Sequence, residues 1–195
     1  MSTDLTTYGR QYVAKKPLFS FLGRKFYFHG PEGNLRFFVK MKAFRLKEAI
    51  TVFADESQSK ALLTIKARSI MDFSAAYDVT DVATGEVIGA CRREGLKSMM
   101  RDEWTIMGPD DAYIGNLVED SIFLALVRRF VIKGWIPQGY SVNAPLGPIG
   151  KVKQRFNPFQ LVYDVSFDGS HTNEMDPRLG VALVVLLLAI EGRQQ

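Results

Sequence analysis

Few side chains in this sequence could carry out chemistry on a substrate. The two histidines, His29 and His171, have no cysteine nearby in the sequence, and we interpret both as surface residues rather than as a metal ligand or a base. The single cysteine, Cys91, alternates with an outward Arg92, so we expect a buried and unreactive thiol. The sequence therefore predicts a protein that is not an enzyme, with no catalytic residues and no cofactor.

Carboxylates near the C-terminus are the nearest approach to a hard-cation site: Asp164, Asp168, Glu174 and Asp176. Calcium prefers such oxygen ligands, but their spacing is not that of an EF-hand loop. Asp176 directly precedes Pro177 and fits better as a helix N-cap. We predict no metal site.

Basic residues at alternating positions of two expected strands are the best candidates for a binding site. A β-strand points successive side chains to opposite faces. Arg36, Lys40 and Lys42 would therefore form a first basic ladder, and Lys151, Lys153 and Arg155 a second one, each opposite a core face. Phe38 falls on the same face as the first ladder, where we expect it to be exposed and able to insert among lipid headgroups. The candidate lipid- or anion-binding residues are Arg36, Lys40, Lys42, Lys151, Lys153 and Arg155.

The charge of the chain is unevenly distributed. Its 195 residues carry a net charge of +4, but residues 5–47 contain ten basic residues against Glu32 alone. This asymmetry favours an anionic partner, either a membrane surface or nucleic acid. Nucleic acid is disfavoured because no stacking platform interleaves with the basic residues. The alternative is that the ladders only keep the surface soluble, in a structural or protein-interaction module that has no lipid ligand.

The last apolar stretch, residues 177–190, predicts a helix that begins after Asp176 and has Gly192 just beyond it. Such a helix would be about 21 Å long, which is short of the roughly 30 Å of a bilayer core, so we expect no transmembrane span. All of its faces are apolar, and a short helix of this kind must be enclosed by protein.

The rest of the chain alternates short strands with turns. Ile50, Tyr77 and Trp104 each enter a hairpin and lie 27 residues apart. We predict a mainly β fold, a closed antiparallel barrel of about a dozen strands around the hydrophobic C-terminal helix. An additional short helix is expected over residues 121–133, where acidic residues precede and basic residues end an apolar run. We expect one domain over residues 1–195 with an ordered core at about 12–191.

The order of four segments resembles the tubby C-terminal-like superfamily, in particular the LURP-one-related and phospholipid-scramblase-like proteins. These segments are Ile149-Gly-Lys-Val152, Arg155-Phe-Asn-Pro-Phe159, Tyr163-Asp-Val-Ser-Phe167 and Asp176-Pro-Arg-Leu179. The resemblance implies a barrel around a central helix and no catalytic set. Because tubby relatives bind phosphoinositides, it also implies that anionic phospholipid or phosphoinositide is the partner. A helix sealed in a barrel cannot span a bilayer, which weighs against scramblase activity.

The beginning of the chain lacks the charged and then apolar pattern of a signal peptide, and one cysteine suits a reducing compartment. We therefore expect a cytoplasmic protein, or one that is peripheral to the inner face of the membrane.

Overall fold

The computed structural model describes residues 8–17, 24–41, 49–68, 75–94, 103–120 and 137–191. The helix predicted over residues 121–133 lies outside these ranges, as do Lys42 and Gly192.

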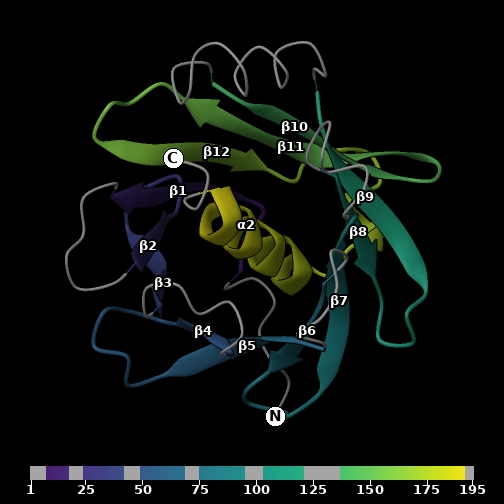
Figure 1. The fold of residues 1–195 in the computed structure, drawn as a ribbon, viewed down its shortest axis with the longest axis horizontal. Helices are drawn as coiled ribbons and strands as arrows, with labels where there is room; N and C mark the ends of the chain where they lie inside the picture. Colours follow the sequence, from purple (N-terminus) through teal and green to yellow (C-terminus); the bar gives the residue numbers. More distant parts are fainter. Residues whose placement is uncertain are drawn as a thin grey trace.

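In the described residues, twelve antiparallel strands form a closed barrel around one α-helix, as the sequence predicts (Figure 1). Each strand pairs with its neighbours in the chain, and β1 pairs with β12 to close the barrel. The elements are β1 Gln11–Pro17, β2 Arg24–His29, β3 Leu35–Met41, β4 Ile50–Phe53, β5 Ala61–Ala67, β6 Ala76–Asp81, β7 Val87–Arg93, β8 Glu103–Met107, β9 Tyr113–Glu119, β10 Gly139–Ala144, β11 Gly147–Arg155, β12 Gln160–Ser166, the 3-10 turn η3 Thr172–Glu174 and the helix α2 Pro177–Glu191.

Buried and outward-facing side chains alternate along the strands because apolar and polar residues alternate in their sequences. Along β2, Phe26 and Phe28 face inward and are fully buried, whereas Lys25 and Tyr27 face outward. One glycine is needed where the helix approaches the wall. A Cβ on Gly89 in β7 would lie 2.2 Å from the Met107 carbonyl oxygen, and the φ angle of Gly89 is +146°. Only glycine fits here, because a Cβ would clash with the backbone of β8 and would also lie 3.1 Å from the Leu179 Cδ1 atom of α2.

The helix α2 lies inside the barrel and is encircled by the strands (Figure 1). Its side chains from Leu179 to Ala189 are at most 2% exposed apart from the buried Gly180, so the predicted enclosure is confirmed. Asp176 caps the first turn, because its Oδ1 atom accepts a hydrogen bond of 2.8 Å from the Arg178 N–H. Among the described residues, no helix is both long enough and apolar enough to cross a membrane.

Basic side chains of the barrel wall bind the C-terminal end of α2. Lys16 Nζ donates to the Leu188 carbonyl oxygen at 3.1 Å, and Arg24 Nη1 donates to the Ala189 carbonyl oxygen at 2.7 Å. Lys16 is 4% exposed and points inward. The last carbonyls of a helix have no intrahelical donor and carry partial negative charge, so these two cations satisfy and stabilise them.

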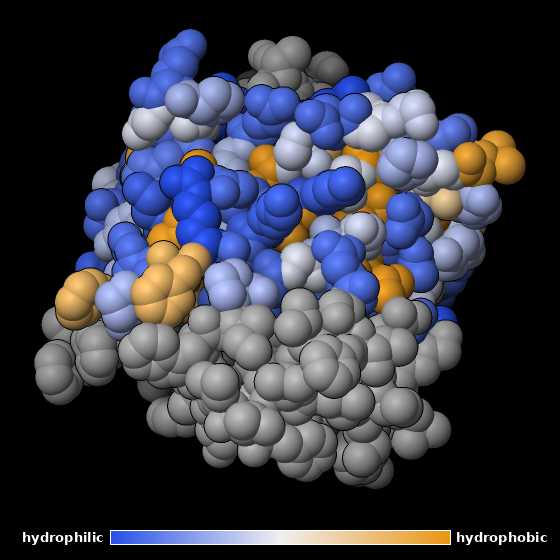
Figure 2. All heavy atoms as spheres, turned by 90° about the horizontal axis from the view of Figure 1, so that it is seen from above, coloured by the Kyte–Doolittle hydropathy of each residue, from blue (hydrophilic) through white to orange (hydrophobic). Residues whose placement is uncertain are grey.

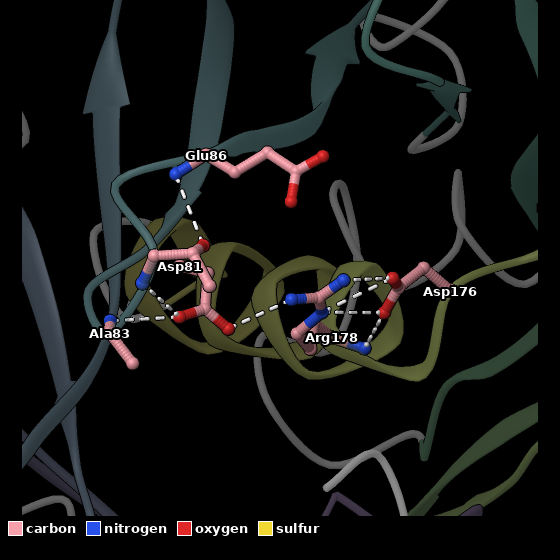
Figure 3. A network of polar contacts seen from close by, with 6 residues as sticks. Asp81, Ala83, Glu86, Asp176 and Arg178 are labelled. Carbon is pink, nitrogen blue, oxygen red and sulfur yellow. Dashed lines mark hydrogen bonds and ion pairs between the residues drawn. The ribbon is translucent and has the colours of Figure 1, made fainter. Parts of the chain in front are cut away.

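A buried ion-pair network holds the N-terminal end of α2 to the wall (Figure 3). Arg178 Nη1 donates to Asp81 Oδ2 at 2.8 Å, and Arg178 Nη2 donates to Asp176 Oδ2 at 2.6 Å. Asp81, at the end of β6, is 1% exposed, and its Oδ1 accepts the backbone N–H groups of Ala83 and Thr84. The hydrogen bond to Asp176 is the largest cause that raises the pKa of Arg178 above its ordinary value.

Candidate functional site

Closure of the barrel brings the two predicted basic ladders onto the same side of the barrel. The first ladder lies on β3 and the second on β11, and only β2, β1 and β12 separate them. These five strands contain nine lysines and arginines but a single carboxylate, Asp164. The other seven strands contain three basic and four acidic residues. The barrel is therefore electrically polarised, with one basic side.

We define the basic face as the outward-pointing cations of these five strands. Lys16 and Arg24 are excluded because they bind the carbonyl end of α2. Arg36 is excluded because it lies elsewhere, as described below. The basic face consists of Lys15, Lys25, Lys40, Lys151, Lys153 and Arg155.

The second ladder has the predicted arrangement. Lys151, Lys153 and Arg155 are all exposed on the outer side of β11, and Val152 between them is buried. Arg155 is paired in two hydrogen bonds with Asp164 of β12, one of them 2.5 Å long between Nε and Oδ2. Asp164 also lies opposite Lys153 in the register. Lys151 lies opposite Ser166 on β12 and Ser141 on β10, so its partner on each neighbouring strand is a serine and not an acidic residue.

The first ladder is altered by a β-bulge. Lys40 is exposed and lies opposite Lys25 of β2, which adds a cation that the sequence analysis did not select. The register shifts between Phe28 and His29, so that His29 lies opposite Leu35 and the alternation breaks at Arg36. The Arg36 side chain packs over Gly9 and Gly30, where a Cβ would lie within 2.5 Å of its guanidinium or Nε.

The prediction that Phe38 is exposed is wrong. Phe38 is 1% exposed although it is not part of the inward-facing core. It lies beside Tyr27 on the outer side of the barrel, with ring centroids 5.3 Å apart, and opposite Phe53 of β4. A ring packed among aromatic neighbours cannot be the side chain that inserts into a membrane.

Two other phenylalanines are exposed beside the basic face. If the alternation of β11 continued past Arg155, Phe156 would share the buried face of Val152, but Phe156 is 55% exposed because the strand ends at Arg155. Phe159, in the same turn, is 73% exposed. The signal that could have revealed them is Asn157-Pro158 between the rings, a pair that is typical of turns.

The thiol, the second histidine and the C-terminal carboxylates considered for catalysis or metal binding are buried or paired with other side chains. Cys91 is fully buried as predicted, and burial raises its pKa to about 12. His171 Nδ1 lies 2.6 Å from Glu174 Oε1, and the other three C-terminal carboxylates each contact a different basic or amide side chain. Within the described part of the chain, no three His, Cys, Asp or Glu side chains gather closely enough to hold a metal ion.

His29 gives a prediction about pH. Its Nδ1 atom is buried and has no hydrogen-bond partner among the described residues. Burial lowers the pKa of His29, with a further contribution from the charge of Lys15. The folded state therefore favours neutral His29. Its contribution to stability is complete above the unfolded pKa of about 6.5 and is lost as the pH falls through the lower folded value.

We expect the stability difference between His29→Gln and the wild type to change in favour of the variant as the pH is lowered from 7.5 to 5, measured by urea unfolding. Glutamine has no imidazole to protonate, so the penalty disappears. The matched control is His171→Gln, which removes the histidine that faces Glu174. A pH-independent difference for His29→Gln would contradict the assignment.

Comparison with known proteins gives one finding. The family model described as LURP-one-related matches residues 35–188, which is most of the chain and includes both ladders and nearly all of α2. No curated protein matches the chain, and no solved structure matches it.

Proposed function

Because the chain belongs to the LURP-one-related family, part of the tubby C-terminal-like superfamily, and its barrel has one basic side, we propose that it binds anionic phospholipid or phosphoinositide at a membrane surface. The proposed site is the basic face, without Phe38. Of the predicted candidates it does not include Arg36, which packs over Gly9 and Gly30, or Lys42, which lies outside the described residues. In this proposal the protein is not an enzyme and acts at the inner face of the membrane, where anionic lipids are concentrated.

The observation that carries this proposal is the placement of the cations. A charge near an anionic leaflet contributes about 1 kcal/mol, so three or four lysines in contact would give binding that can be measured. Lys40, Lys151 and Lys153 are exposed, and Lys15 and Lys25 are half-buried on the strands between them. Screening acts over roughly 8 Å at physiological salt, so binding by this face should weaken steeply as salt is raised.

Two alternatives compete with this proposal. A structural or protein-interaction module without a lipid ligand would use the barrel loops, and its basic face would serve solubility. Scramblase activity is not proposed, because the apolar helix α2 is enclosed by the strands.

Charge reversal on β11 tests the proposal. We expect Lys151→Glu/Lys153→Glu to lower the affinity for vesicles of phosphatidylcholine with phosphatidylserine or phosphoinositide by about 30-fold or more, since two charges near the surface contribute about 2 kcal/mol. Flotation of the full chain with these vesicles, at low and at physiological salt, measures the effect. Neutral phosphatidylcholine vesicles are expected to bind neither protein.

The control changes the net charge by the same amount on the other side of the barrel. Lys60→Glu/Lys66→Glu alters two exposed lysines, one in the β4–β5 turn and one on β5. We expect this variant to float almost like the wild type. Equal losses of vesicle affinity in the two variants would mean that only net charge matters. Absence of binding to any vesicle would favour the protein-interaction alternative.

A further inference from the structure

The turn between β11 and β12 presents two aromatic rings to solvent at one end of the barrel. Phe159 is 73% exposed and Phe156 is 55% exposed. Both rings belong to the same short turn, and exposed apolar side chains that gather on a surface commonly mark an interaction site. The turn lies at the end of the barrel where Lys16, opposite Leu161 of β12, reaches the C-terminal end of α2.

The turn is held in one shape by its own polar residue. Asn157 Oδ1 accepts hydrogen bonds from the backbone N–H groups of Phe159 at 2.9 Å and of Gln160 at 3.1 Å. Pro158 fixes its own φ angle between the two rings. The rings are therefore presented by a preorganised turn, which reduces the entropy that binding would cost.

The strand that leads into this turn, β11, carries cations on its outer side. Arg155 precedes Phe156, and Lys153 and Lys151 continue the same outer face of β11. Figure 2 looks onto the top of Figure 1, where β10, β11 and β12 lie, and shows apolar atoms at the left edge next to hydrophilic ones. That edge is where the β11–β12 turn lies in Figure 1.

Another exposed apolar side chain provides a contrast. Leu146, in the turn at the other end of β11, is 81% exposed, but residues 142–150 contain no charged side chain. An anionic surface would therefore be attracted to the Phe156–Phe159 end and the adjoining lysines, and not to Leu146. The aromatic rings and the cations together match the layered chemistry of an anionic bilayer, in which apolar chains lie beneath charged headgroups.

We propose that the β11–β12 turn inserts Phe156 and Phe159 into the headgroup region of an anionic bilayer while the adjacent cations of the basic face bind lipid phosphates. This inference rests on the proposed function and adds to it the element that enters the membrane. Electrostatic attraction brings the face to the surface, and the two rings then contribute an apolar component that salt does not screen.

Ring removal tests the apolar component. We expect Phe156→Ser/Phe159→Ser to bind anionic vesicles about tenfold or more weakly than the wild type, since partial burial of each ring contributes to affinity. The residual binding should vanish at high salt, whereas part of the wild-type binding should persist. Phe159→Ser alone is the second variant, for use if the double variant unfolds, and thermal melting checks the fold of both.

The control for ring removal is Leu146→Ser, which deletes an exposed apolar side chain at the opposite end of β11. It is expected to leave vesicle binding unchanged. Equal affinities and equal salt dependence for the wild type and folded Phe159→Ser would overturn the insertion.

A fluorophore reports insertion directly. The buried Cys91 is expected to resist labelling in the folded protein, so Phe159→Cys and Leu146→Cys can each be labelled with an environment-sensitive dye. With phosphatidylserine vesicles, we expect a blue shift and quenching by shallow spin-labelled lipid for the dye at position 159 only. Vesicle binding without a shift at position 159 would overturn insertion and leave the proposed function standing. Absence of vesicle binding by the unlabelled wild-type protein would contradict both the insertion and the proposed function.

Discussion

Val185→Asp is expected to yield no folded protein. Val185 is fully buried in the middle of α2, and its neighbours Val184 and Leu186 are equally buried. A carboxyl group there either stays charged without a partner or takes up a proton, and a pKa shift of 3–5 units costs about 4–7 kcal/mol. Loss of the apolar burial of valine adds about 1.5–3 kcal/mol. The total is comparable to the whole stability of a typical domain, about 5–15 kcal/mol.

The same substitution at an exposed valine is the control. Val82 is 41% exposed in the β6–β7 turn, and Val82→Asp is expected to express and to melt cooperatively. Leu186→Ala, which removes volume without adding charge, should fold and lose about 2–5 kcal/mol in denaturant unfolding. Soluble expression, far-UV circular dichroism and thermal melting measure the series. A soluble, cooperatively melting Val185→Asp protein would contradict the enclosure of α2.

The parts of the fold that were predicted are those that depend on local pattern. Ile50, Tyr77 and Trp104 lie at or next to the start of β4, β6 and β8, and each begins a hairpin as expected. Strands of period two and a helix that is apolar on every side can be recognised within a short window of sequence. Enclosure of the helix followed from its composition, because water could not solvate any of its faces.

The arrangement of the site depended on information that such windows do not contain. The two ladders can be recognised separately, but their placement on one side of the barrel requires the pairing of β1 with β12, whose partners Gln11 and Ser166 are far apart in sequence. The consecutive Lys15 and Lys16 look alike in the sequence. The register decides that Lys15 lies on the basic face and Lys16 points inward to the Leu188 carbonyl oxygen.

Errors arose where a pattern was extended beyond its element or its neighbours. Alternation continued past Arg155 would place Phe156 on the core face, but β11 ends at Arg155. Phe38 was assigned to solvent because it points out of the barrel, but cross-strand aromatic neighbours bury it. Burial of an outward side chain depends on what lies beside it on neighbouring strands, and alternation along one strand does not contain that information.

Arg178→Met is expected to destabilise the protein by about 3–5 kcal/mol, the second large effect, because it removes the countercharge from a buried carboxylate. Asp81 is 1% exposed, and its Oδ2 atom accepts from the Arg178 guanidinium, while its Oδ1 atom accepts backbone N–H groups. The methionine side chain can fill most of the volume of the arginine stem, so the loss reports mainly on charge. Urea unfolding of both proteins measures the difference.

A double-mutant cycle separates the ion pair from general disruption. Asp81→Asn keeps an oxygen that can accept the N–H groups of Ala83 and Thr84, but it removes the charge. If the pair is coupled as Figure 3 indicates, Arg178→Met/Asp81→Asn should lose less stability than the sum of the two single variants. Strict additivity would mean that the two side chains do not interact in solution.

An exposed network of the same kind provides the control for the effect of burial. Arg68 also bridges two carboxylates, Asp78 at 2.6 Å and Asp111 at 2.7 Å, but its side chain is 34% exposed. Water screens this network and solvates the carboxylates that remain after Arg68→Met, so that variant should lose no more than about 1 kcal/mol. The same substitution in two similar geometries then differs mainly in burial. A large loss for Arg178→Met beside a small loss for Arg68→Met would identify the Asp81–Arg178 pair as the fixed link between the enclosed helix and the barrel wall.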